Sequence, residues 1–363
     1  MSRRRDGSQH QAHLITQDAR EAPPQATGAR EASPQLVARA REAFGWGADV
    51  VVTAGPRGAL GQIWQVETGA ARYALKEIFA EPPSEAMVEA ELDFTRRAAG
   101  AGVRMPASLP DRSGRYLLPA PGGGWLRLYA WVDLRPVDPA GRATPDELGA
   151  LLARLHRCAP AMSVEAGGGE PDPWYDRVPA PGAWERAAAS GAEWARRLAE
   201  RLARLPELAA AVAPADPAAL IMCHRDLHPE NVLAGPGGGL VVVDWDNLGP
   251  AAPARELAQA LFDWFCDGPG PDLDAMRRMY DAYVREGGPG RITGPADFSM
   301  LVASQLNFLL VQAGVALDPE AEPRHRAWAE REIDETLRRL PDPRWLAQAL
   351  DLLGGGRAQA TEP

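Results

Sequence analysis

Lysine is almost absent from this sequence: Lys76 is its one lysine, and arginine supplies the other 38 of the 39 basic residues. A lysine ammonium is a compact point charge, which a planar guanidinium cannot imitate. The position that kept a lysine is therefore a candidate for a contact that arginine cannot make. The alternative is the chance survival of a single lysine codon.

Cysteine is also scarce, and basic residues are outnumbered by acidic ones, 39 to 49. The three cysteines, Cys158, Cys223 and Cys266, are odd in number and widely spaced. This spacing argues against a disulfide framework or a CxxC metal site and favours a reducing, cytoplasmic compartment. The formal net charge of −10 lacks the basic surplus that nucleic-acid binding requires, so we expect no nucleic-acid partner.

No apolar run predicts a leader or a membrane span. Arg3–Arg5 are not followed by the hydrophobic segment of a secretory signal. Residues Ser299–Leu317 carry no formal charge, but a membrane span would tolerate poorly the four polar residues inside this stretch, Ser304, Gln305, Asn307 and Gln312. We predict a buried helix there and no membrane partner.

The length of 363 residues fits about two domains of ~150 residues each. Residues 1–34 are polar, with few large aliphatic side chains, and predict a disordered tail. Short β-like segments occupy residues 35–130, helical patterns occupy 131–353, and 354–363 predict a flexible tail. The predicted fold class is α+β, with a small antiparallel β-rich lobe that holds one helix and a larger, mainly helical lobe.

Short strands with tight turns are expected at residues 50–52, 62–67 and 72–79, the last of which carries Lys76, and again at 116–118 and 125–131. A loop is expected over residues 53–61, with glycines at 55, 58 and 61. These glycines would let the backbone approach a phosphate group, although such glycines are more often plain turn residues.

One helix is expected in the β-rich lobe, from an N-cap at Ser84 to Ala99. Its apolar side includes Val88 and Phe94, and Glu91 lies within that side. A carboxylate on a buried helix face needs a partner. In the second lobe, Thr144 begins a capping-box pattern, and amphipathic helices are expected near residues 184–205, 254–266, 273–286, 297–316, 324–340 and 343–353.

The stretch Leu220–Asn247, LIMCHRDLHPENVLAGPGGGLVVVDWDN, concentrates polar residues between apolar ones. Apolar residues on both sides of the glycine run 235–239 predict a β-hairpin, which would place Asn231 opposite Asp244, beside the loop that carries Asp226. Amide and carboxylate oxygens grouped in this way suit Mg²⁺. Asp226 then remains for another role, which is to accept the proton of a hydroxyl group or to orient that hydroxyl. A strand that ends in Asp is about as often only a loop cap.

Two histidines within this stretch could instead indicate a metal site. His224 and His228 are four residues apart beside Cys223, a spacing that holds a metal ion on a continuous helix. Pro229 and the flanking strands argue against such a helix. We therefore expect His224 to be structural, and likewise His156 at a helix end.

The pattern HxDxxxxN followed by a strand ending in Asp resembles the protein-kinase-like superfamily. The form HRDLHPENVL…VVVDWDN resembles the aminoglycoside phosphotransferase family, which also includes choline, homoserine and macrolide kinases. LLARLH at 151–156 and the segment Arg255–Ala258 resemble recurring helices of that family. The resemblance implies a protein-kinase-like fold of two lobes.

The resemblance also implies a role for each matching residue. Asp226 matches the catalytic aspartate, and Asn231 and Asp244 match the metal ligands. Lys76 matches the lysine that contacts the nucleotide phosphates, and Glu91 matches the helix partner of that lysine.

Three positions depart from the family pattern. The loop GPRGALG is not GxGxxG, so Gly58 and Gly61, the glycines assigned to nucleotide contact, would act through the backbone. Arg225 stands where small-molecule kinases of the family often have glycine, and Glu256 stands where aspartate is common.

We therefore predict an enzyme, an ATP-dependent kinase that uses Mg²⁺ and transfers the γ-phosphate to a hydroxyl of a small molecule such as an antibiotic or amino alcohol. A catalytically inactive nucleotide-binding protein of the same fold is the alternative. A protein kinase is less favoured, because Trp245–Asn247 follows Asp244 in place of Phe-Gly and leaves no room for a long activation segment.

The charge distribution bears on the acceptor. Residues 1–34 carry 5 basic and 4 acidic residues, residues 35–133 carry 11 of each, and residues 134–363 carry 23 basic and 34 acidic residues. An acidic surface attracts cations, so a neutral or cationic acceptor is expected. The alternative is a solvated acidic face that maintains solubility. The acids that suggest this surface lie just after the metal motif: Asp263, Asp267, Asp272 and Asp274. The acceptor's identity, the choice of ATP or GTP and the oligomeric state are left open.

Overall fold

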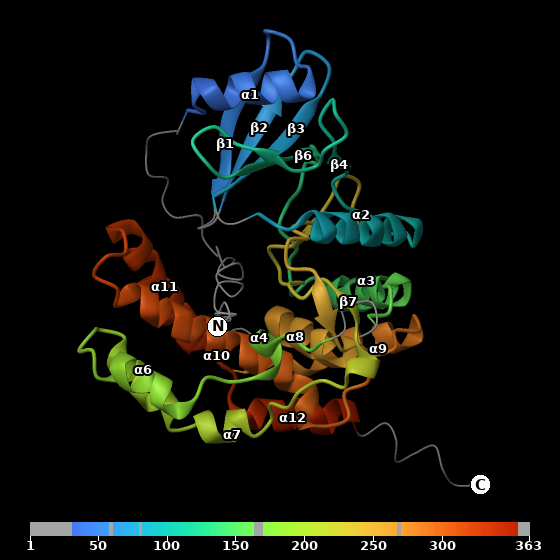
Figure 1. The fold of residues 1–363 in the computed structure, drawn as a ribbon. Coiled ribbons are helices and arrows are strands. Elements are labelled where there is room, and N and C mark those ends of the chain that lie inside the picture. Colours follow the sequence, from blue (N-terminus) through green and yellow to red (C-terminus); the bar gives the residue numbers. More distant parts are fainter. Residues whose placement is uncertain (1–30, 58–60, 80–81, 163–169, 267–269, 355–363) are drawn as a thin grey trace, which may run out of the picture. The chain divides into compact units, whose positions relative to one another are not determined.

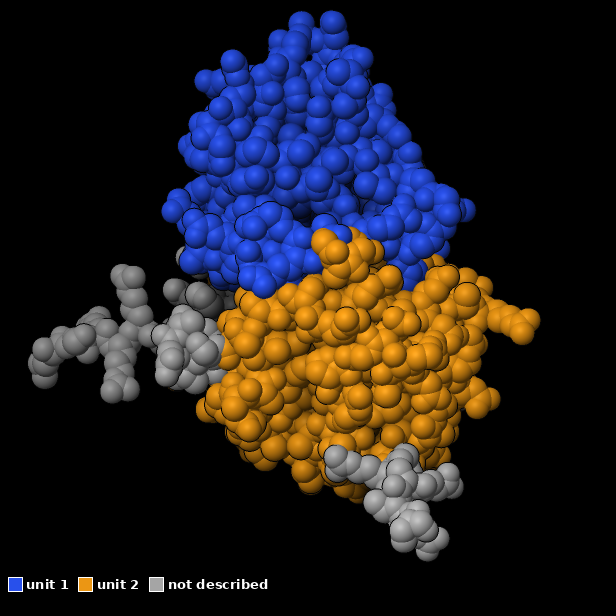
Figure 2. Space-filling view, turned by 90° about the vertical axis from the view of Figure 1, so that its right-hand side faces the viewer, with its two compact units in different colours: residues 1–99, 104–136, 233–246 blue, residues 100–103, 137–232, 247–363 orange. Residues whose placement is uncertain are grey.

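The computed structural model describes residues 31–57, 61–79, 82–162, 170–266 and 270–354. They divide into two compact units, coloured separately in Figure 2. The first holds the described residues up to 99 together with 104–136 and 233–246. The second holds 100–103, 137–232 and the described residues from 247 onward. Of the tail predicted at residues 1–34, residues 1–30 lie outside the described residues.

The first unit is built on an antiparallel sheet with the strand order β1-β2-β3-β6-β4, in which β5 also pairs with β6 (Figure 1). The strands are β1 Val51–Arg57, β2 Gly61–Glu67, β3 Arg72–Ile78, β4 Ser108–Leu109, β5 Leu118–Pro119 and β6 Trp125–Ala130. The prediction of a loop at residues 53–61 is wrong over residues 53–57, because β1 continues to Arg57. The Gln62 side-chain amide donates to the carbonyl oxygens of Gly55 (2.8 Å) and Pro56 (3.1 Å), which holds this irregular stretch against β2.

Two helices accompany the sheet. α2 (Glu85–Gly100) forms as predicted, and the Ser84 hydroxyl accepts the backbone N–H of Met87. α1 (Pro34–Phe44) is not among the sequence predictions. Ser33 caps its first turn and Gly45, at φ 71°, ends it. Its buried residues share one apolar core with the sheet: Leu36, Ala40, Ala43, Trp64, Val66, Leu75, Leu118, Ala120, Leu126 and Leu128.

The predicted hairpin is present as β8 (Val232–Ala234) and β9 (Leu240–Val242), joined through glycines with positive φ at 237–239. The lobe boundary predicted at residue 130 assigns this hairpin to the helical lobe, whereas the structure groups residues 233–246 with the sheet unit. Arg104 explains the grouping. Its carbonyl accepts the Val242 N–H at 2.9 Å, and its guanidinium donates to the carbonyls of Pro236 and Gly238.

The second unit is mainly helical. Its α-helices are α3 Thr144–Cys158, α4 Pro173–Asp176, α5 Glu185–Ala188, α6 Ala195–Leu202, α7 Leu205–Ala209, α8 Pro253–Phe265, α9 Leu273–Arg285, α10 Ser299–Ala316, α11 Pro323–Arg339 and α12 Pro343–Gly354. Short 3₁₀ turns lie at Pro181–Trp184, Pro217–Ala219 and Pro295–Phe298, and β7 (Ile221–Cys223) pairs with β10 (Gly249–Ala251).

Two helix predictions differ in detail. The helix expected at residues 184–205 is broken into α5 and α6, because Gly191 lies between them at φ 73°, outside the helical region. The capping box expected at Thr144 is absent: Ala143 is the N-cap of α3, and the Thr144 hydroxyl donates instead to the carbonyl of Asp138 at 2.9 Å.

The uncharged helix is part of the helical core. Pro295–Ala316 is the one helix of the described residues that is long and apolar enough to cross a membrane by length and composition, and 56 % of its apolar window is buried inside the protein. α10 packs against α4, α8 and α11. The amide of Asn307 donates to the carbonyls of Trp174 and Arg177, both at 2.8 Å, which satisfies one of its polar side chains within the protein.

Candidate active site

The strand register of the first unit places its lone lysine beside a buried arginine. Lys76 on β3 lies directly opposite Arg127 on β6 in an antiparallel pair. Directly opposite residues project from the same face of a sheet. Two adjacent cations repel each other unless carboxylates lie between or beside them, and three carboxylates do so here: Glu91, Asp244 and Asp246.

Lys76 contacts the segment that follows β9. Its Nζ donates to Oδ1 of Asp244 at 3.0 Å and to Oδ2 of Asp246 at 2.7 Å. Burial alone would lower the pKa of Lys76, but the two carboxylates outweigh it and raise that pKa above its ordinary value. Lys76 is therefore a charged ammonium at neutral pH, 168 residues away in sequence from the first carboxylate that it binds.

Arg127 is the ion-pair partner of Glu91. Its two terminal nitrogens donate to the two carboxylate oxygens of Glu91 at 2.6 and 2.7 Å, and a further contact of 3.4 Å reaches Asp246. The Arg127 side chain is fully buried. Burial raises the pKa of Glu91 despite this partner. The resemblance assigned Glu91 to Lys76, but among the described residues the ion pair of Glu91 is with Arg127.

The chemistry of this cluster fits a divalent cation. Three carboxylates accompany two cations, which leaves an excess of one negative charge. Carboxylate oxygens are the hard ligands that Mg²⁺ prefers. Asp244 also has φ 55°, a left-handed conformation that is uncommon for a residue other than glycine and is concentrated at functional sites. A metal ion at Asp244 would offset the excess charge.

The two candidate glycines give no evidence of a phosphate cradle. Gly58 lies outside the described residues. Gly61 begins β2 opposite Ile78, and a Cβ at this position would lie 2.7 Å from the carbonyl oxygen of Glu77. The close approach of β3 therefore explains the glycine at position 61 without a ligand.

The second unit holds the loop with the predicted catalytic aspartate, between β7 and β8. The Asn231 amide nitrogen donates to Oδ2 of Asp226 at 3.0 Å and to the Asp226 carbonyl at 2.9 Å. These two bonds fix the carboxylate relative to the asparagine five residues later. With its nitrogen engaged in this way, the amide of Asn231 would offer its oxygen, the atom that Mg²⁺ prefers.

His228 also contacts the aspartate, a role that the sequence did not predict. Its Nε2 lies 3.5 Å from Oδ1 of Asp226. Burial by itself would lower the pKa of His228, but the Asp226 carboxylate outweighs it, and the pKa rises to about 9. The ring is also held by its neighbours, because its Nδ1 accepts the backbone N–H of Glu230 at 3.3 Å and its Nε2 lies 3.1 Å from the Asn231 amide nitrogen.

Arg225, one of the three departures from the family pattern, anchors the loop that carries Asp226. It adopts φ 64° and donates to the carbonyl of Asn247 (2.8 Å) and to Asp172 (2.9 Å), while its guanidinium lies over the Tyr175 ring. Its backbone N–H donates to Glu256 on α8. These contacts, rather than a glycine, support the left-handed turn.

Glu256, another of these departures, joins the loop to the helical core. It accepts a bond of 2.6 Å from Nε2 of His156, whose Nδ1 lies 2.7 Å from the Tyr283 hydroxyl. Burial raises the pKa of Glu256, but the bond to His156 dominates and lowers it. His156 therefore has the structural role that was expected.

One buried group has metal-like spacing. His156, Cys223 and Glu256 each place one ligand atom within 4.8 Å of the others. Both ring nitrogens of His156 are already engaged, and burial raises the pKa of Cys223, which keeps its thiol neutral and a poor ligand. No disulfide joins the three cysteines, all of which lie in the described part of the chain.

The comparisons with known proteins agree with this organisation. Residues 51–294 match the model of the phosphotransferase enzyme family. An uncharacterized protein of Deinococcus radiodurans is 27 % identical over 294 residues, which cover 76 % of this chain and 80 % of that protein.

Solved structures resemble this chain in fold. A microcompartment-associated aminopropanol kinase has a TM-score of 0.61 at 18 % identity, covering 88 % of this chain and all of that one. The amicoumacin kinase hAmiN, in complex with AMP-PNP, Ca²⁺ and Ami, has a TM-score of 0.57 at 17 % identity, covering 87 % of this chain and 97 % of that one. At these identities the structural likeness establishes the fold alone. Membership of the family rests on the family model, which matches most of the chain. This protein belongs to the phosphotransferase enzyme family, with the fold of its small-molecule kinases.

Proposed function

We propose that this phosphotransferase transfers the γ-phosphate of ATP to a hydroxyl group of a small molecule. One observation carries the proposal: Lys76 Nζ lies 3.0 Å from Asp244, so a candidate phosphate-binding cation and a candidate metal-binding carboxylate meet in one place. Phosphoryl transfer depends on positioning and charge neutralisation more than on covalent chemistry of the protein. A lysine and a carboxylate brought together from sites 168 residues apart support such a role.

The nucleotide would be held by its phosphates. Lys76 would contact phosphate oxygens, and Asp244 and Asn231 would hold Mg²⁺ through their side-chain oxygens. The metal ion, when bound, neutralises charge on the phosphate oxygens. Nucleotide use is supported by hAmiN, which was solved with AMP-PNP and Ca²⁺. Asp246 and Arg127 would keep Lys76 and Glu91 in place.

The acceptor hydroxyl would be oriented by Asp226. Its carboxylate is held by the Asn231 amide and lies 3.5 Å from Nε2 of His228, so it would accept a hydrogen bond from the acceptor in a defined direction. A carboxylate can receive the hydroxyl proton as the oxygen bonds to the γ-phosphorus and the bond from that phosphorus to ADP breaks.

A neutral or cationic acceptor is the proposed substrate class. The acidic excess of residues 134–363 supports it. One carboxylate of the helical unit adds to this support: within the described part of the chain, Oε1 of Glu230, next to Asn231, is buried without a hydrogen-bond partner. The acids after the metal motif support it less, because Asp272 caps α9 by accepting the Ala275 N–H.

The deciding experiment is Mg²⁺-dependent ATP turnover in a screen of hydroxylated antibiotics, amino alcohols and other metabolites, with wild type and Asp226→Asn. We expect phosphorylated product with wild type, and turnover lower by orders of magnitude, with nucleotide binding retained, for Asp226→Asn. Nucleotide binding without turnover of any acceptor would favour the alternative, an inactive nucleotide-binding protein. Unchanged turnover in Asp226→Asn would remove the role assigned to Asp226.

A further inference from the structure

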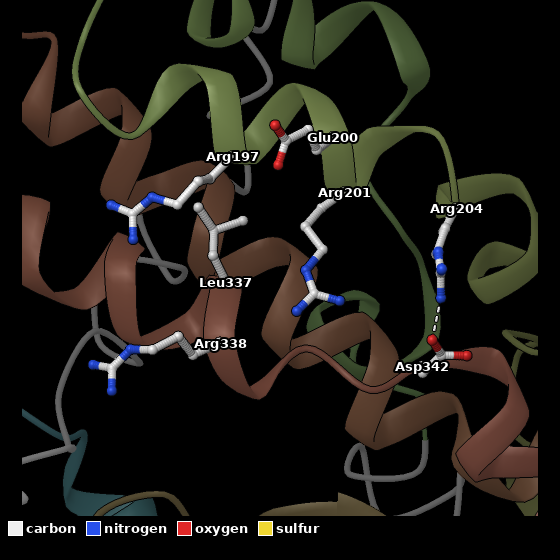
Figure 3. Close-up of a pocket in the computed structure, with 7 residues that line it drawn as sticks. All are labelled: Arg197, Glu200, Arg201, Arg204, Leu337, Arg338 and Asp342. Atoms are coloured by element: carbon white, nitrogen blue, oxygen red, sulfur yellow. Dashed lines mark hydrogen bonds and ion pairs between the residues drawn. The ribbon is translucent and has the colours of Figure 1, made fainter. Parts of the chain in front are cut away.

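The helical unit contains a basic pocket that the proposed function does not use. It lies between α6 and the C-terminal end of α11, and it has a volume of about 410 Å³ (Figure 3). That volume is within the range of ~300–1,000 Å³ typical of small-molecule sites. Four arginines line it: Arg197, Arg201, Arg204 and Arg338. None of them belongs to the loop of Asp226 or to the cluster around Lys76.

Carboxylates neutralise only part of this charge. Arg204 pairs with Asp342, which Arg344 also contacts at 3.0 Å. Arg197 pairs with Asp334 of α11. In the part of the chain that the structure describes, neither Arg201 nor Arg338 has a carboxylate partner.

The remaining acid of the pocket is engaged elsewhere. Glu200 accepts a bond of 2.6 Å from Arg196, which does not line the pocket. The lining residues and their ion-pair partners together comprise six arginines and three acids, a net charge of +3. This positive region belongs to a segment, residues 134–363, in which acids exceed bases by 11.

The chemistry of this lining selects an oxyanion. Guanidinium groups bind phosphate through paired N–H donors, and an anion between them removes the repulsion among like charges. The C-terminal end of α11 stabilises Arg338 electrostatically. Among the described residues, the guanidinium of Arg338 uses one donor, Nε, in a bond to the carbonyl of Asp334, and its other donors stay available. Leu337 adds an apolar surface to the pocket, suited to the carbon skeleton of a ligand.

We propose that this pocket binds the phosphate group of a small organic phosphate through Arg201 and Arg338. Arg197 and Arg204, already paired with carboxylates, supply the surrounding positive field. The side chains of Arg197 and Arg204 are 41 % and 48 % exposed, so the affinity is modest and falls as ionic strength rises. The proposal goes beyond the phosphotransferase function and stands whether or not that function is confirmed.

The test uses the full chain and glycerol 3-phosphate, with inorganic phosphate in parallel. Arginine Nε–Hε NMR resonances report binding at the pocket itself, and calorimetry gives the dissociation constant. We expect the resonances of Arg201 and Arg338 to shift on titration. Arg201→Gln/Arg338→Gln should weaken this binding at least tenfold, and Arg201→Lys/Arg338→Lys should weaken it less, because charge is kept while the paired donors are lost.

The matched control is Arg96→Gln/Arg186→Gln, which removes the same charge from exposed positions outside the pocket. It should bind glycerol 3-phosphate like wild type. Circular dichroism and the thermal midpoint establish that each variant is folded. Tighter binding of glycerol 3-phosphate than of inorganic phosphate supports the organic phosphate, and equal affinities overturn that part of the proposal. Unmoved Arg201 and Arg338 resonances in wild type, or a double Gln variant that binds within twofold of wild type, overturn the site.

Discussion

Separating Arg127 from Glu91 should destabilise the sheet unit strongly. Arg127 is fully buried, and Glu91 is 5 % exposed. With two hydrogen bonds of 2.6 and 2.7 Å, the centres of charge lie roughly 4 Å apart, where an effective dielectric constant of ~20 gives an attraction of about 4 kcal/mol. Arg127→Met leaves the carboxylate of Glu91 buried without its partner, and breaking a buried pair in this way costs about 3–5 kcal/mol.

The double variant separates the charge effect from simple packing loss. Arg127→Met/Glu91→Leu removes both charges, and replacement of a buried pair by apolar side chains is often nearly neutral. We therefore expect the double variant to be more stable than Arg127→Met by at least ~2 kcal/mol. Urea unfolding gives the free energies, and hydrogen exchange of the peptides that contain β3 and β6 assigns the change to the sheet unit.

The control for this prediction is an exposed ion pair in the same unit. Arg97 contacts Asp93 at 2.8 Å with side chains 53 % and 41 % exposed, and exposed pairs contribute at most about 1 kcal/mol. Arg97→Met should therefore change the unfolding free energy little. The reasoning is refuted if Arg127→Met costs less than about 1 kcal/mol, or if the double variant loses as much stability as the single variants Arg127→Met and Glu91→Leu together.

Three further predictions concern charge at the site and on α11. Lys76→Arg keeps the charge but not the compact shape, so we expect a folded protein whose turnover falls at least ~10-fold; full activity would make the single lysine a codon accident. Asp244→Ala should weaken Mg²⁺-nucleotide binding as well as turnover, because a ligand is lost before the reaction begins; an unchanged Mg²⁺ dependence in a titration would contradict the metal role. Burial, with the like charges of Glu335 and Glu230, raises the pKa of Glu332 to about 8, above the ~4.3 of an unfolded glutamate. Protonation of Glu332 therefore stabilises the folded protein fully below the unfolded pKa, and this stabilisation is lost as pH rises through the folded pKa. Urea unfolding at pH 5 and pH 9 should show a loss of roughly 2 kcal/mol after allowance for solvent, and Glu332→Gln should abolish that loss.

Local signals in the sequence were enough for most of the elements. The hairpin of β8 and β9 followed from its glycine run, and α2 followed from Ser84 and an apolar side that repeats with the helical period. The helix at 184–205 was overextended, because its apolar pattern continues across Gly191 while the backbone there is left-handed. α1 was missed because its apolar face is made largely of alanine, which gives a weak periodic signal.

The sequence also identified the chemical groups of the candidate site. Lys76 was singled out by composition, and the spacing of Asp226, Asn231 and Asp244 was singled out by the pattern around a predicted hairpin. Such signals are local, since each depends on residue type and on spacing within one segment. The structure then brought Lys76 to Asp244 and Asn231 to Asp226.

Only the tertiary structure decided which charge meets which. Glu91 was expected to need a partner, but nothing in its own helix indicates Arg127, which lies 36 residues away on β6. Arg127 stands beside Lys76 because of the β3–β6 register, and a shift of one residue would turn its side chain to the other face of the sheet. Pairing between distant charges depends on register and packing, which are properties of the whole fold, whereas residue type and spacing are already present in the chain.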